Sequence, residues 1–233
     1  MKKSLFLILT ILVVLCVFCF VGCKKSDPTP EKTGLQTRVS TYQEAVYVGS
    51  DDSFDVSFVT GEAEKLIVID GEVGEMAPFA TLTVTPLAFA LFNNTYTYLL
   101  KGESGERSGN LTKDVIGASF SADLENAKEI GKVQSVTIIA EGISENLVEL
   151  TNKLDGALSW KEALAIAEKE LAEAITAESD TGALPREIYV KLVNALSDAD
   201  APYYYYVSFI KSSSDYWALL LDPMTGEVIS KKV

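Results

Sequence analysis

The sequence predicts a protein of the mainly β plus α+β class. We expect an N-terminal antiparallel β-sandwich of immunoglobulin-like size, followed by a smaller C-terminal α+β domain with one helix on an antiparallel sheet. Three observations lead to this prediction. From about residue 39 to residue 151, apolar and polar residues alternate with the period of two that is typical of half-buried strands. At Ser159 the spacing of apolar residues changes to three and four, which is typical of an amphipathic helix. Beyond residue 203 the period of two returns.

The composition is globular and acidic. Of 233 residues, 48% are hydrophobic and 23% charged, and 20 Lys and Arg against 33 Asp and Glu give a net charge of −13. This balance argues against a nucleic-acid partner, because such proteins neutralise phosphates with clustered cations. The chain has no histidine, which excludes Ser-His-Asp catalysis, Cys-His catalysis and His-ligated zinc. We therefore expect no enzyme activity, no cofactor and no metal site.

The N-terminus has the pattern of an export signal. A positive segment, 1–4, precedes an apolar run, 5–21, and the run ends at Gly22-Cys23. With Phe20-Val21-Gly22-Cys23 as a lipobox, this segment resembles a bacterial lipoprotein signal peptide. The resemblance implies that residues 1–22 are removed and that lipid on Cys23 anchors the chain on the extracytoplasmic side of a membrane. An uncleaved transmembrane anchor is the alternative, since the run is near the lower length limit for spanning a bilayer.

Residues 23–37 are polar, contain Pro28 and Pro30, and show no periodicity. This composition predicts a semi-extended tether. The β-sandwich domain is expected over residues 38–155. Its strands are expected at 54–58, 65–70, 81–85, 95–100, 115–121, 133–141 and 147–151, separated by glycine-containing turns.

A C-terminal domain is expected over residues 156–233. Ser159 and Glu162 fit a capping box, which predicts a helix over 160–176 with one apolar stripe. The segment 186–196 fits a strand and a helix equally well. Strands are predicted at 203–211, 216–222 and 227–231. Between the last two, Asp222 can accept turn N–H groups and Gly226 can adopt the left-handed conformation.

This C-terminal pattern resembles the PepSY domain. The resemblance rests on Glu162-Ala163-x-x-x-Ala167, Tyr205-x-Val207-x-Phe209 and, most specifically, Asp222-Pro223-x-Thr225-Gly226-Glu227-Val228. It implies a helix packed on a small antiparallel sheet. The family occurs in propeptides of secreted metalloproteases and in envelope lipoproteins, with a proposed role in restraining proteases. Asp222, Thr225 and Gly226 are interpreted as turn formers, so no catalytic residue is assigned.

Three aromatic residues are candidates for binding a partner: Tyr204, Tyr206 and Trp217. In a strand, Tyr204 and Tyr206 point away from Tyr205, which the family pattern assigns to the helix. They would then lie on an open face of the sheet, where aromatic residues can form a binding surface. The alternative is that this face packs on the β-sandwich and that both tyrosines are interdomain core.

Two functions remain open at this point. The first is a non-enzymatic membrane lipoprotein of the cell envelope that binds or restrains another protein, such as a protease, through the PepSY-like domain. The second is a cell-surface lipoprotein that binds a carbohydrate or wall component through the β-sandwich. An exposed aromatic patch on the C-terminal sheet would favour the first, and an aromatic-lined groove in the sandwich would favour the second.

Overall fold

The computed structural model describes residues 34–233, except 67, 116–117, 141–143, 180–183 and 195–200. The expected signal peptide, Cys23 and most of the tether lie outside the described residues. Residues 34–233 form one compact unit. It begins earlier than expected, with the 3₁₀ helix η1 (Gly34–Arg38). The Leu35 N–H donates to Glu168 Oε1 at 3.1 Å, which attaches η1 to the C-terminal helix.

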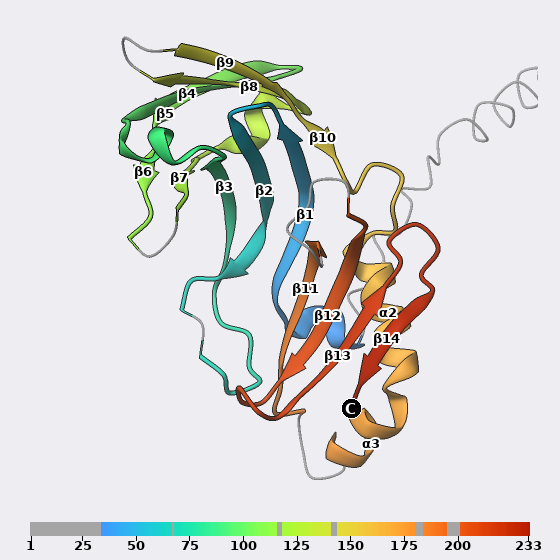
Figure 1. Cartoon of the computed structure of the whole chain (residues 1–233). Coiled ribbons are helices and arrows are strands. Elements are labelled where there is room, and N and C mark those ends of the chain that lie inside the picture. The colour runs from blue at the N-terminus through green and yellow to red at the C-terminus, as the bar shows by residue number, and fades with distance from the viewer. Residues whose placement is uncertain (1–33, 67, 116–117, 141–143, 180–183, 195–200) are drawn as a thin grey trace, which may run out of the picture. The chain divides into compact units, whose positions relative to one another are not determined.

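The described part is mainly β, as predicted, and its larger sheet has ten strands (Figure 1). Nine of them follow the order β14-β13-β12-β11-β1-β2-β3-β7-β6, and β10 also pairs with β1. The strands are β1 (Val39–Ser50), β2 (Phe54–Glu64), β3 (Met76–Pro86), β6 (Thr112–Lys113), β7 (Phe120–Asp123), β10 (Thr151–Asn152), β11 (Glu187–Asn194), β12 (Tyr203–Ile210), β13 (Tyr216–Leu221) and β14 (Val228–Lys232). The β1–β11 pair is parallel, and the other strand pairs of this sheet are antiparallel. The sheet therefore continues across the expected domain boundary at residue 155.

A second sheet and two consecutive helices complete the unit. The smaller antiparallel sheet has the order β5-β4-β8-β9, with β4 (Tyr96–Gly102), β5 (Gly105–Asn110), β8 (Val133–Ala140) and β9 (Ser144–Glu149). The short 3₁₀ helices η2 (Phe89–Asn93) and η3 (Ala127–Ile130) lie in its connections. The predicted helix is split at Leu171 into α2 (Trp160–Glu170) and α3 (Ala172–Ser179). Its predicted capping box is confirmed, because Ser159 Oγ accepts from Glu162 N while a Glu162 carboxylate oxygen accepts from Ser159 N.

Two expected segments differ from the structure, and a third segment, which the sequence left open, is a strand. Residues 186–196, left open between helix and strand, contain strand β11. The expected strand at 65–70 is wrong: its described residues, 65–66 and 68–70, belong to the loop between β2 and β3, where Leu66 is 82% exposed. Of the described residues in the expected strand at 115–121, the last two lie in a strand, β7, and 115, 118 and 119 do not; residues 116–117 lie outside the described residues.

Two apolar cores lie against the larger sheet. In the first, the smaller sheet packs on β2, β3 and β7, with Phe54, Phe58, Leu82 and Tyr96 each at most 1% exposed. In the second, α2 packs on β11, β12 and β13 through its buried stripe of Ala163, Leu164, Ala167 and Leu171. Strand β1 contributes Tyr47 to the first core and Val46 to the second. Since neighbouring residues of a strand point to opposite faces, the two cores lie on opposite faces of one sheet.

The loop between β2 and β3 is attached to β11 by buried polar groups. Arg38 donates to the carbonyls of Gly71 and Leu184. The Glu187 carboxylate, 1% exposed, accepts from Gly71 N at 3.0 Å and from the Ser40 hydroxyl. These bonds hold the loop at Gly71 through the side chains of Arg38 and Glu187.

Glu64 gives this junction a pH dependence. The side chain is 6% exposed, so burial raises its pKa; the Gly74 N–H lowers it, and the carboxylates of Glu187 and Asp70 raise it further. The folded state therefore binds a proton more readily than the unfolded chain, and this contribution to stability is lost as pH rises through the folded-state pKa. Glu64→Gln, which carries no charge, is expected to become more stable relative to wild type between about pH 4 and about pH 8. The measurement is the melting temperature of each protein as a function of pH. If the difference between the two melting temperatures stayed constant across this range, the prediction would be contradicted.

Arg186 connects α3 to the β12–β13 hairpin from a buried position. Its side chain is 5% exposed and is paired with Glu178 and, at 2.9 Å, with Asp215. Its guanidinium also lies 3.8 Å from the centroid of the Trp217 ring. Removing the cation takes one charged partner from Glu178, which is 18% exposed and also pairs with Lys211 at 2.8 Å.

Arg186→Ala is expected to lower the free energy of unfolding by about 2–3 kcal/mol, because one member of a buried ion-pair network is lost. Arg107→Ala is the matched control, since Arg107 pairs with Glu129 at the surface, where side-chain exposures are 37% and 65%. Its loss is expected to be less than about 1 kcal/mol. Urea denaturation measures the free energy of unfolding of both variants. Equal losses would show that the buried network stabilises the fold no more than a surface ion pair does.

Candidate binding surfaces

Strand β12 divides its tyrosines between the two faces of the sheet. Tyr205, Val207 and Phe209 are buried in the second core against α2. Tyr204 and Tyr206 point to the other face, are half-buried, and belong to neither core. Cross-strand pairing adds further side chains to this surface. We call it the aromatic face, and define it as Tyr189, Lys191, Tyr204, Tyr206, Tyr216, Leu220 and Lys232.

The aromatic face presents phenol rings and amines. Lys191 Nζ lies 5.1 Å from the Tyr189 ring centroid, and Lys232 Nζ lies 3.3 Å from that of Tyr216. Burial lowers the pKa of Lys191, while burial and the nearby Tyr216 raise the pKa of Tyr206. Within strands β11 to β14, the one acid pointing to this face is Glu187, which is buried. The face thus combines apolar area with hydrogen-bond donors, as protein-binding surfaces commonly do.

Trp217, the third candidate, lies on the opposite face of the sheet. It pairs across the strands with Phe209, is 8% exposed, and belongs to the second core. The structure therefore brings Tyr204 and Tyr206 to one surface and places Trp217 beneath Arg186 in the core. The sequence leaves this open, because the face of each β13 residue depends on its register with β12.

The motif of Asp222, Thr225 and Gly226 forms a turn that packs on α2. Asp222 Oδ1 accepts from Met224 N at 2.9 Å and from Thr225 N at 2.8 Å, which confirms the predicted turn chemistry. Accepting these bonds lowers the pKa of Asp222. Gly226 has φ +75°, and a Cβ there would meet Ile166 Cδ1 at 2.5 Å. The turn is therefore both a chain reversal and a contact with the helix.

Gly226→Ala is expected to destabilise the fold by about 1–3 kcal/mol, because a left-handed residue acquires a Cβ that collides with α2. Gly105→Ala is the control: φ is not positive there and no atom lies within 4 Å of the added Cβ. Its effect is expected to stay within about 0.5 kcal/mol. Chemical denaturation compares the two, and a neutral Gly226→Ala would contradict the packing role of the turn.

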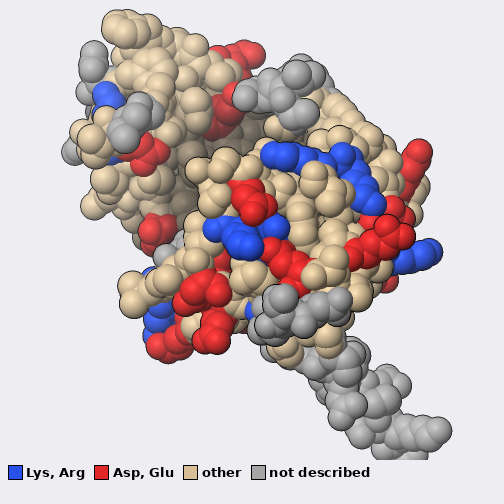
Figure 2. Space-filling model, turned by 90° about the horizontal axis from the view of Figure 1, so that it is seen from below, with Lys and Arg blue, Asp and Glu red and all other residues tan. Residues whose placement is uncertain are grey.

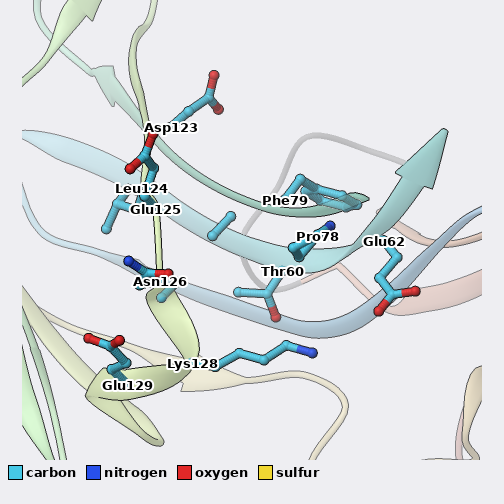
Figure 3. Close-up of a pocket in the computed structure, with 12 residues that line it drawn as sticks. Thr60, Glu62, Pro78, Phe79, Asp123, Leu124, Glu125, Asn126, Lys128 and Glu129 are labelled. Atoms are coloured by element: carbon cyan, nitrogen blue, oxygen red, sulfur yellow. The ribbon is translucent and has the colours of Figure 1, made fainter. Parts of the chain in front are cut away.

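A groove of about 760 Å³ lies between the middle of β2 and β3 and the chain segment that runs from β7 into η3 (Figure 3). Its apolar lining includes Pro78, Phe79, Ala80, Leu124 and Ala127. Four carboxylates line it as well, those of Glu62, Asp123, Glu125 and Glu129, with Lys128 as the one basic residue of the lining. We call this the acidic groove. We did not predict this groove from the sequence, where its only local signal is the acid-rich segment 123–129.

A smaller groove of about 360 Å³ has a different chemistry. Hydroxyl side chains from β2 and β3, Ser57, Thr83 and Thr85, line it together with Asp55. Tyr203 is the one aromatic residue of its lining, and Lys153 Nζ lies 5.7 Å from the Tyr203 ring centroid. We call this the polar groove.

Charges are mixed on the one face of the molecule that Figure 2 shows. Figure 2 shows acidic and basic side chains interspersed on the face seen from below, next to a hollow in the surface. Among the described residues, no group of three or more His, Cys, Asp or Glu is arranged to hold a metal ion. None of the helices in the described part of the chain is long and apolar enough to cross a membrane. No family model matches the chain, and neither a curated protein nor a solved structure matches it significantly.

Proposed function

We propose that this chain is a membrane-anchored extracytoplasmic lipoprotein that binds or restrains another protein, without catalysis of its own. Lipid on Cys23 would hold it at the membrane, and the PepSY-like residues 156–233 would supply the binding surface. The observation that carries the proposal is the aromatic face, where Tyr204 and Tyr206 remain half-buried outside both cores. The arrangement of α2 on antiparallel strands β11 to β14 also agrees with the resemblance to PepSY domains.

The aromatic face suits a protein partner on physical grounds. Tyrosines provide large apolar contact area at a small cost in side-chain entropy, and each retains a hydroxyl for hydrogen bonding. Lys191 and Lys232 add donors that already lie against the rings, so their ordering cost on binding is reduced. A partner that covers Tyr204 and Tyr206 would bury the part of each ring that the fold leaves exposed.

The proposal is tested by crosslinking capture from native membranes, using the full chain and a Tyr204→Ala, Tyr206→Ala double variant. We expect wild type to capture a specific envelope protein or protease. The amount captured by the double variant is expected to be at least about tenfold lower, as for the loss of interface hot spots. The melting temperature of the variant is expected to fall by less than about 4 °C. Unchanged capture, or a large loss of thermal stability, would contradict the proposal, the latter indicating that both tyrosines are packing residues.

The polar groove supports a second candidate function, the binding of a carbohydrate or wall component. Sugars are bound by hydrogen bonds to their hydroxyls and by contact with an aromatic ring, and the groove offers Asp55, several hydroxyls and Tyr203. Tyr203→Ala separates the two functions, since Tyr203 is on the same strand as Tyr204 but lines the other surface. Loss of glycan binding in this variant with capture intact would favour the second function.

A further inference from the structure

We propose that the acidic groove binds an extended peptide segment in which Lys or Arg residues alternate with apolar residues. This inference does not rest on the proposed function, because the groove shares no residue with the aromatic face. It assigns a second surface, of opposite charge, to the chain.

The charge of the groove favours a cationic occupant. Lys128, the one basic residue of the lining, lies 3.2 Å from Glu44, and Glu129 is paired with Arg107. Counting Glu44 and Arg107 with the lining residues still leaves a net charge of −3. Figure 3 shows Asp123, Glu125 and Glu129 on the η3 side of the groove, with Glu62 across from them on β2. The lining therefore places carboxylates on more than one side of the groove. Asp123 Oδ1 also accepts from the Thr81 hydroxyl at 2.7 Å, and Glu62 is a hydrogen-bond partner of Tyr42, so a bound cation would share these carboxylates with donors of the protein.

The apolar part of the lining requires more than a cation. Ala80 and Leu124 form buried floor positions, 6% and 9% exposed, and Phe79 and Pro78 lie beside them. A simple ion would leave this floor in contact with water, whereas an apolar side chain between two cations would cover it. The volume of about 760 Å³ also lies in the range of sites that bind drug-sized ligands, which leaves room for an apolar side chain beside a cationic one.

The charge of the whole chain favours the same occupant. Its net charge of −13 attracts cationic segments before contact and repels acidic ones. Because Glu125 and Glu129 are exposed, the attraction is screened by salt, and the affinity is expected to fall as ionic strength rises.

The test is fluorescence polarisation with the full-length chain in neutral detergent and a labelled peptide of sequence Lys-Leu-Lys-Leu-Lys. Glu125→Lys is expected to weaken binding by at least about tenfold, because it reverses a charge on the rim. Glu145→Lys is the matched control, with the same change in net charge on β9, which lies at the opposite edge of the smaller sheet from β5. It is expected to change the affinity by less than about twofold. A peptide with Ser in place of Leu is expected to bind at least about fivefold more weakly.

Three results would overturn the inference. These are the absence of binding at low salt, equal weakening by Glu125→Lys and Glu145→Lys, and equal binding of the Leu and Ser peptides. The second and third would mean that the peptide responds only to net charge. The Tyr204→Ala, Tyr206→Ala variant is expected to bind the peptide like wild type, so failure here and failure of the proposed function can be told apart.

Discussion

The fold depends on the position of β1, which is bonded along both edges. One edge pairs with β2 along almost the whole strand, and the other pairs first with β11 and then with β10. Between the β11 and β10 ladders, side chains make the hydrogen bonds that a strand would otherwise make. Gln43 Oε1 accepts from Leu192 N at 2.6 Å, and Asn152 Oδ1 accepts from Val46 N at 3.1 Å. Because few backbone groups are left unpaired, β1 joins the sandwich and the helix-covered strands into one sheet.

The position of β1 in the large sheet explains why parts of both faces of that sheet remain uncovered. The smaller sheet covers one face of the large sheet over β2 and β3, and α2 covers the other face over β11 to β13. Each face is therefore covered at one end and open at the other. The aromatic face is one open end, and the polar groove, with Ser57 and Thr83 paired across β2 and β3, occupies the other. The aromatic face and the polar groove therefore both follow from the way β1 joins the two covered parts of the sheet.

The sequence predicts features that depend on local chemistry. The capping box at Ser159, the turn at Asp222 and the alternation of Tyr204, Tyr205 and Tyr206 each require only neighbouring residues. Features that depend on distant pairing could not be predicted. The β1–β11 ladder joins Val39 to Ile188, and the bulge between Gln43 and Ala45 interrupts the alternation by which β1 could have been recognised. The acidic groove likewise combines residues of β2, β3 and η3, whose proximity is set only by the sheet order.

The two proposed surfaces cannot serve the same ligand chemistry. On the aromatic face, Lys191 and Lys232 lie against tyrosine rings and the nearest strand acid, Glu187, is buried, so a cationic segment would meet like charge. In the acidic groove a carboxylate-bearing segment would be repelled. Since strand pairing through β1 connects β2 directly to β11, the spacing between the surfaces is fixed by backbone hydrogen bonds. A partner that engages both must therefore present a cationic segment and an acidic or neutral one at a set separation, a demand that gives specificity beyond either contact alone.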